Sequence, residues 1–114
     1  LASDTAAAGT INQVILPNNS AYAFKGQIIA NVTGAAAGQV WSFEGGIMRG
    51  GSAANTYLIG TPIINSLGAS PVGLLWNVAL TADTTNGGLA VTVTGKAATT
   101  IRWVCQIETV EMTY

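Results

Sequence analysis

Side chains that commonly carry out catalysis are scarce in this sequence. None of the 114 residues is histidine, so the commonest general base and metal ligand is missing, and no Ser-His-Asp or Cys-His site can be assembled. Glu108 and Glu111 are close in sequence but differ in parity, so a regular strand points them to opposite faces. We therefore expect a protein that is not an enzyme and that uses no metal and no cofactor.

Two further polar residues have structural interpretations. The single cysteine, Cys105, shares its parity with Trp103 in a β-like stretch, so we expect a buried, inert thiol and no nucleophile. Asp83 precedes a Thr-Thr-Asn-Gly-Gly segment and is expected to cap its own turn.

Aromatic residues could serve a different function, because exposed rings can stack on the apolar faces of sugars. The three tryptophans, Trp41, Trp76 and Trp103, share faces with aliphatic neighbours, which favours a place in the core. Tyr57 lies beside a turn-rich segment. Tyr57 and Asn55 are therefore the candidate carbohydrate-binding residues.

The elements that position these residues are strands. Apolar and polar residues alternate over long stretches, and no apolar period of three to four residues persists, so we expect no substantial helix. The alternating stretches are residues 21–33, 39–49, 74–81, 89–94 and 101–110. About seven strands linked by Gly, Asn and Pro turns predict an all-β fold, an antiparallel β-sandwich or jelly-roll-like domain.

The order of these strands also carries expectations. Residues 82–88 contain Asn-Gly and predict a hairpin, and the strand after residues 95–98 is expected to complete a three-stranded meander. The pattern weakens over residues 51–73, where we expect a broken strand, a loop after it and any recognition loop. Residues 1–9 are expected to form a linker or leading arm, and residues 10–114 a single domain. Because Leu1 is not a start methionine, we expect a piece of a longer protein.

Low charge points to a covered surface. Only 8% of the residues are charged, with a net charge of −1, whereas soluble monomers usually keep more charge outside. Several expected outer faces mix charges with aliphatic residues, so we expect them to pack against sister chains. The alternative is that these residues are ordinary half-exposed aliphatics. The candidate interface residues are Ile29, Val40, Met48, Val104 and Val110.

Other partners are disfavoured. The four cationic side chains are scattered singly, which gives no electrostatic footprint for nucleic acid. No apolar run reaches the ~20 residues that a membrane-spanning helix needs, so we expect no membrane insertion.

Four segments carry a resemblance to a known family. They are LPNNSAYAFKGQIIANVTG (16–34), WSFEGGIMRG (41–50), ADTTNGGLAVTVTG (82–95) and TTIRWVCQIETVEMTY (99–114). Together they resemble the C-terminal β-domain of bacteriophage tail fibre and tailspike receptor-binding proteins, from about Ile11 to the end. No individual site residue is carried over from the family.

The resemblance implies a homotrimeric module of the virion, at the end of a phage tail fibre and extracellular at the host surface. Such a module would help the fibre to trimerise and would contact a host cell-surface glycan. The alternative is a stand-alone carbohydrate-binding module appended to a depolymerase. Oligomeric state separates the two, because only the first requires sister chains.

Overall fold

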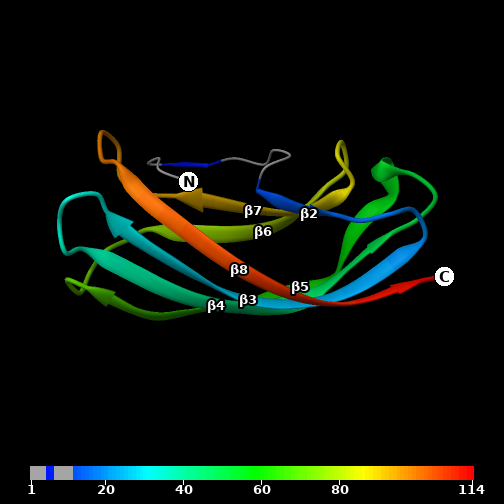
Figure 1. Ribbon diagram of the computed structural model, residues 1–114, viewed down its shortest axis with the longest axis horizontal. Coiled ribbons are helices and arrows are strands. Elements are labelled where there is room, and N and C mark those ends of the chain that lie inside the picture. Colours follow the sequence, from blue (N-terminus) through cyan, green and yellow to red (C-terminus); the bar gives the residue numbers. More distant parts are fainter. Residues whose placement is uncertain (1–4, 7–11) are drawn as a thin grey trace.

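The computed structural model describes residues 5–6 and 12–114, which form two antiparallel sheets packed face to face (Figure 1). The elements are β1 (Thr5–Ala6), β2 (Gln13–Ile15), β3 (Ser20–Val32), β4 (Gly38–Arg49), the 3₁₀ turn η1 (Ala53–Asn55), β5 (Thr56–Ser70), β6 (Asn77–Asp83), β7 (Gly88–Thr94) and β8 (Ile101–Thr113). The predicted all-β antiparallel sandwich of about seven strands is confirmed. Most of the predicted linker at residues 1–9 lies outside the described residues, although Thr5–Ala6 within it pairs with β7.

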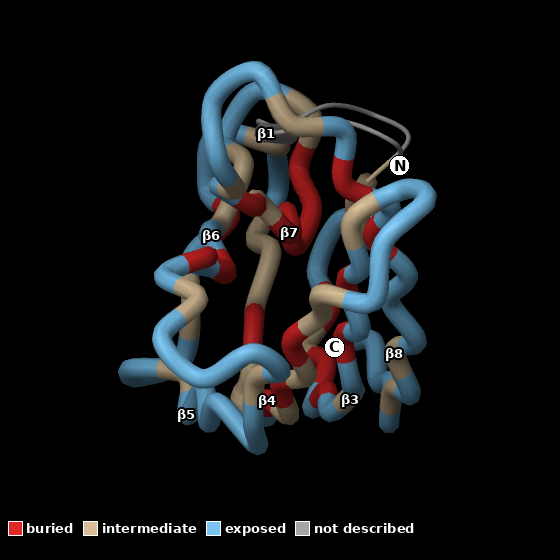
Figure 2. The backbone as a smooth tube through the Cα atoms, turned by 90° about the vertical axis from the view of Figure 1, so that its left-hand side faces the viewer, coloured by how far each residue is buried: buried red, intermediate tan, exposed pale blue. Residues whose placement is uncertain are grey.

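The large sheet has the strand order β5-β4-β3-β8. Its strands follow the predicted alternation: in β3, Phe24 and Ile28 are buried while Lys25 and Ile29 are exposed. Because cross-strand partners point to the same side of a sheet, one face of all four strands is turned toward the core and the other away from it. Buried segments accordingly lie between the two layers (Figure 2).

The small sheet is centred on β7. β6 pairs along one edge of β7, whereas β1 and β2 pair end to end along the other. The predicted β6–β7 hairpin is present, with Gly87 at φ +76° in its turn. Glycine adopts this left-handed conformation without a steric penalty.

The predicted meander of the last three strands is wrong, because β8 pairs with β3 in the large sheet. Residues 95–100 carry the chain from one layer to the other, and the Thr33 amide donates to the Thr100 carbonyl at 3.0 Å where β8 begins. This crossing buries Ile101 and Trp103 between the sheets. β8 is the edge strand of the large sheet next to β3.

The core is built on the three tryptophans, whose predicted burial is confirmed. The Trp41 and Trp103 rings stack with centroids 5.7 Å apart, and Trp76 from the small-sheet side lies 6.0 Å from Trp103 in a tilted arrangement. Aromatic contacts of this kind add about 0.5–1.5 kcal/mol beyond the burial of area. The cluster thus ties the two layers together.

Two glycines in the large sheet make room for phenylalanine rings. Gly26 is the cross-strand partner of Phe43, and Gly45 is the partner of Phe24. A Cβ atom at Gly26 would come within 2.6 Å of Phe43 Cζ, and one at Gly45 within 2.8 Å of Phe24 Cζ. Each ring therefore occupies the space that its partner's side chain would take.

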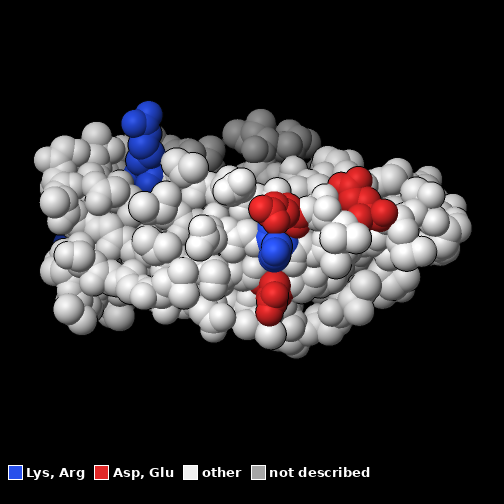
Figure 3. All heavy atoms as spheres, turned by 60° about the horizontal axis from the view of Figure 1, so that its bottom comes forward, with Lys and Arg blue, Asp and Glu red and all other residues white. Residues whose placement is uncertain are grey.

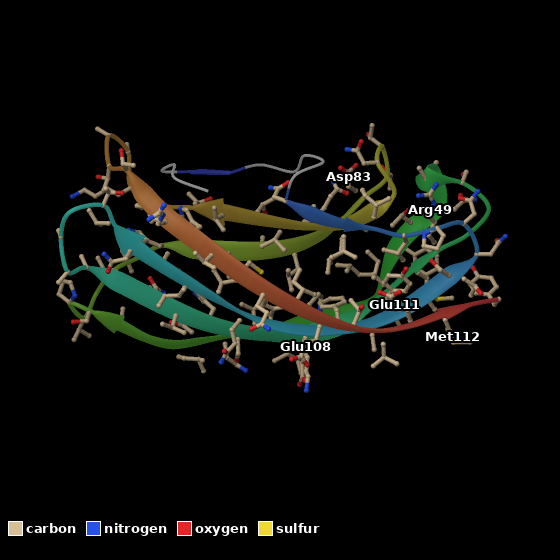
Figure 4. All side chains as sticks on the ribbon, in the orientation of Figure 1. Arg49, Asp83, Glu108, Glu111 and Met112 are labelled. Atoms are coloured by element: carbon tan, nitrogen blue, oxygen red, sulfur yellow. The ribbon has the colours of Figure 1, made fainter. Side chains whose placement is uncertain are left out.

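Arg49 joins the two layers at one end of the sandwich. Its Nη1 donates to the Leu16 carbonyl at 2.7 Å and to the Gly87 carbonyl at 3.3 Å, and its Nε donates to Asn18 Oδ1 at 2.9 Å. Leu16 follows β2 and Gly87 lies in the β6–β7 turn, so a side chain of the large sheet holds segments of the small one. Figure 4 shows Arg49 at the same end as Asp83.

The segment expected to be a broken strand and a loop is one long edge strand. β5 runs for 15 residues and pairs with β4, with register shifts between Val40 and Trp41 and between Glu44 and Gly46. The shift between Glu44 and Gly46 accommodates Gly60 and Pro62, the two residues on which the predicted break in the strand was based. These residues bulge the strand without ending it.

Candidate interaction surface on the large sheet

The outer face, which is the side of the large sheet turned away from β6 and β7, is organised in rows of cross-strand neighbours. One such row contains Gly68, Val40, Ile29 and Val104, and we call it the valine row. Ile29 is 54% exposed and Val104 57% exposed. Three of the five predicted interface residues are thus direct neighbours on one surface.

The remaining two lie toward the opposite end of the same face. Met48 belongs to the methionine row (Tyr57, Met48, Ala21, Met112), and Val110 belongs to the Val110 row (Ile59, Gly46, Ala23, Val110). Val110 and Met112 are exposed and Met48 is half-buried. The outer face therefore has an apolar region at each end.

A polar band separates the two apolar regions. The charge row consists of Ile63, Glu44, Lys25 and Glu108, and the adjacent amide row of Asn65, Ser42, Gln27 and Gln106. Lys25 Nζ lies 3.8 Å from Glu108 Oε2, and both side chains are largely exposed. Charged side chains gather near the middle of an otherwise largely uncharged surface (Figure 3).

The polar band is hollowed into a shallow groove of about 380 Å³. Its lining combines carboxylates, an ammonium group, a hydroxyl and three amides, all of which can hydrogen-bond with a polyhydroxylated ligand. Sequence patterns do not predict this groove, because its residues come from four strands whose order the patterns leave open. The only feature of the sequence that pointed to this surface was the mixture of charged and aliphatic residues on the expected outer faces of the strands.

The predicted carbohydrate-binding residues lie at a corner of the outer face. Tyr57 is 51% exposed, and its hydroxyl donates to Met48 Sδ at 3.4 Å. Asn55 is exposed at the end of η1, and its carbonyl accepts a hydrogen bond from the Gly50 amide at 3.0 Å. Tyr57 therefore shares a row with Met48, which was predicted to contact sister chains.

Cys105 departs from expectation. It has the inward parity of Trp103, yet the residue is exposed, because β8 is an edge strand and the layers are open beside it. It lies with Val14, Val93 and Ile107 on an apolar groove between the layers. Partial burial raises the pKa of the Cys105 thiol to about 11, so little thiolate forms near neutral pH.

Asp83 caps its turn as predicted. Its Oδ1 accepts from the amides of Thr85 at 2.8 Å and Asn86 at 3.1 Å, and its Oδ2 accepts from Asn86 Nδ2 at 2.8 Å and Gln13 Nε2 at 3.0 Å. These hydrogen bonds, with that of Gln13 the largest cause, hold the pKa of Asp83 well below its usual range. The carboxylate is thus committed to the turn.

The other carboxylates of the described residues do not gather into a metal site. Glu108 and Glu111 project from opposite sides of β8, as their parity predicts (Figure 4). Over residues 5–6 and 12–114, no three Asp, Glu, Cys or His side chains are grouped closely enough to hold a metal ion. The same described ranges contain no helix with the length and apolar character needed to cross a membrane.

Fold and surface together define an all-β sandwich with a largely uncharged, partly apolar outer face. Comparisons with protein-family models, curated proteins and solved structures find no match for this chain.

Proposed function

We propose that this domain is a structural and adhesive C-terminal module of a phage tail fibre or tailspike. In this proposal, sister chains pack as a homotrimer through the apolar regions of the outer face, and the assembled module contacts a host cell-surface polysaccharide. The protein acts in the virion, at the host surface. The sequence resemblance supplies the biological setting.

The observation that carries the proposal is the position of the candidate interface residues. Ile29, Val40 and Val104 form one continuous row, and Met48 and Val110 lie across the polar band on the same face. Exposed apolar groups that form one patch mark an interaction surface more often than the same groups scattered singly. Burial of apolar area is worth about 25 cal/mol per Å², so both regions would contribute to assembly.

The adhesive function is assigned to the corner that holds Asn55 and Tyr57. The exposed ring offers an apolar surface for a sugar, and the exposed amide offers a donor and an acceptor. Tyr57 lies on edge strand β5 at the end of the methionine row, so this assignment requires sister chains to leave that end of the row uncovered for the polysaccharide.

Light scattering on the 114-residue chain tests the assembly. We expect about three times the chain mass of 11.6 kDa. Ile29→Glu and Val104→Glu place charge in the valine row and should give monomers. Ala36→Glu, in the exposed turn between β3 and β4, is the matched control and should leave the mass unchanged. A wild-type monomer would refute the assembly.

The adhesive function is tested separately on an array of bacterial surface polysaccharides. Tyr57→Ala should abolish binding while the oligomeric mass persists. Tyr114→Ala removes another exposed tyrosine and should leave binding unchanged. Equal binding by both variants would remove Tyr57 from the site.

A second candidate function is favoured by the polar groove. In a glycan-binding domain that acts as a single chain, Gln27, Asn65 and Gln106 would face the ligand directly, because no sister chain covers the outer face. The prediction is a monomer whose glycan binding is lost on Gln27→Ala and retained on Tyr57→Ala.

A further inference from the structure

The free edge of the large sheet that β5 forms carries little of the usual protection. Among the described residues, β5 pairs only with β4, so its other side presents unpaired backbone groups along a 15-residue strand. The strand contains no charged residue, and Ile63 and Leu67 are 54% and 55% exposed. Monomeric proteins usually block such an edge with charges, prolines or a covering segment, because it can template pairing with another chain. Here only the bulge at Gly60 and Pro62 interrupts it.

We infer that β5 pairs with β8 of a second copy of this chain, which joins two large sheets edge to edge. Each strand in the order β5-β4-β3-β8 is antiparallel to its neighbour, so β5 and β8 run in opposite directions. When two copies are placed side by side, β5 of one therefore meets β8 of the next in antiparallel orientation. No loop has to connect the two strands, because they belong to different chains.

The rows of the outer face match across this junction. If the rows continue without a shift, Tyr57 meets Met112 of the partner subunit and Ile59 meets Val110 of the partner subunit. Aromatic–sulfur and aliphatic cross-strand pairs of this kind are favourable. Asn65 meets Gln106 of the partner subunit, so the amide row also continues.

The inward-facing rows match in the register that pairs Asn65 with Gln106, and the bulge at residues 60–62 supplies the two extra residues that separate this register from that of Tyr57 and Ile59. Ile64 and Ile107 occupy the two ends of the row through Phe43 and Gly26, so the junction places them together. Ser66 and Cys105 occupy the ends of the row through Trp41 and Ile28, and they also become neighbours. The less favourable outward pair is Ile63 with Glu108, and there Glu108 keeps Lys25 of its own chain as a partner.

The resulting contact is head-to-tail, because each copy uses a different strand at each of its edges. Such contacts close into rings when the rotation between copies allows it, and a ring of three is one solution. This inference shares one assumption with the proposed function, which is that the partner is a sister chain. It concerns the sheet edges and not the outer face, so the two can fail independently.

A disulfide designed into the junction tests the inference. Within one chain, Ser66 and Cys105 are separated by β4 and β3, which is three strand spacings or about 14 Å, too far for a disulfide. Across the proposed junction they are neighbours at about 4.5–5.5 Å between Cα atoms, which a disulfide can span. Ser66→Cys is therefore expected to link chains through the native Cys105.

The reaction is run on the assembled protein with oxidised glutathione at pH 9. Two thiols lose two electrons and two protons to form the disulfide, and the oxidant becomes two molecules of reduced glutathione. On a non-reducing gel, we expect most of the Ser66→Cys chains to shift from 11.6 kDa to dimers and higher multiples. A reducing agent should restore the single band.

Three controls give each outcome a meaning. The double variant Ser66→Cys/Cys105→Ser should not cross-link. If it does, β5 pairs with β5 of the other copy and the assignment to β8 is overturned. Asn65→Cys, whose side chain faces the outer side, should not link to Cys105. Absence of cross-linking in folded Ser66→Cys, verified by the near-ultraviolet signal of the tryptophan cluster, would overturn the junction.

A second pair tests the same register if Ser66→Cys does not fold. Asn65 and Gln106 are both exposed on the outer face, so Asn65→Cys/Gln106→Cys in a Cys105→Ser background should link chains through the amide row. Cross-linking together with an Ile29→Glu variant of unchanged mass would retain the edge junction and reject packing through the outer face. The opposite combination would reject only the junction.

Discussion

Replacing Gly26 by alanine should be the most damaging single-methyl change in the large sheet. The added Cβ would collide with the backbone carbonyl oxygen of Gln106 and would lie 2.6 Å from Phe43 Cζ. A flexible side chain could move aside, but the Gln106 carbonyl belongs to the neighbouring strand β8. The contact with the carbonyl can be relieved only by a shift of the backbone, and the contact with Phe43 requires its ring to move as well, although that ring already lies against Phe24 at a centroid distance of 6.2 Å.

The expected cost is about 3 kcal/mol of unfolding free energy, at the upper end of the usual range for overpacking a core. Urea unfolding followed by tryptophan fluorescence measures it, because the three tryptophans are buried between the sheets. For a domain of this size, such a loss lowers the Tm by on the order of 10 °C.

Gly68→Ala is the matched control in the same sheet. Nothing lies within 4 Å of the position of its Cβ, so a change of less than about 0.5 kcal/mol is expected there. If Gly26→Ala costs no more than Gly68→Ala, the explanation that Phe43 requires a glycine partner is refuted.

Three further predictions concern polar groups. The hydrogen bonds to Asp83 lower its pKa in the folded protein, so the carboxylate stabilises the fold at pH values above its unfolded pKa. This contribution is lost as the pH falls through the folded pKa. In Asp83→Asn, the free energy of unfolding should therefore fall less steeply with decreasing pH on the acid side. Arg49→Met should cost about 2–3 kcal/mol in urea unfolding through lost charge-assisted hydrogen bonds, whereas exposed Arg102→Met should stay within about 0.5 kcal/mol. Cys105 should react with iodoacetamide in the native protein, with a rate that rises about tenfold per pH unit from 8 to 10, and a pH-independent rate would contradict the raised pKa of its thiol.

Local patterns in the sequence predicted the elements but not their partners. Alternation located β3 and β4, and it placed Trp41 and Trp103 inside, because one face of each strand is buried whichever strand is its neighbour. The meander prediction failed because a short connection after β7 fits both a hairpin and a crossing between layers. The crossing buries Ile101 and Trp103 in the shared core, a gain that no local pattern reveals.

The edges of the sheet were the hardest part to predict. β5 was expected to break at Gly60 and Pro62, but an edge strand tolerates a bulge and a missing amide there, since among residues 5–6 and 12–114 only β4 pairs with it. Cys105 was expected to be buried from its parity, but an inward position on an edge strand is covered only where the opposite layer reaches it. Both errors follow from one unknown, namely which strands lie at the margin.

The outer face was predicted only as a set of mixed positions. Ile29, Val40 and Val104 were selected from three separate strands, and the structure makes them neighbours in one row. That row and the charge row depend on strand order and register, which involve residues far apart in sequence. The arrangement of apolar ends around a polar band was therefore beyond the reach of sequence patterns.

In the proposed assembly, the charge row limits how closely a sister chain can cover the outer face. Burying Glu44, Lys25 and Glu108 away from water would cost several kcal/mol per ion unless the partner paired them. Contact through the apolar regions would restrict access to the groove between them without requiring it to be dry. Lys25 should then be shielded from large reagents even if water reaches it.

The chain contains two lysines, which makes this shielding measurable. Lys25 lies in the charge row, and Lys96 is exposed in the turn before β8, so each reports on a different surface of the same molecule. In a covered assembly, a bulky amine-reactive label should modify Lys25 several-fold more slowly than Lys96, and the difference should disappear in an Ile29→Glu monomer. Equal labelling of the two lysines in a protein of multimeric mass would mean that the outer face is open. Assembly would then have to be carried by another surface, of which the free edges of β5 and β8 are the first to test.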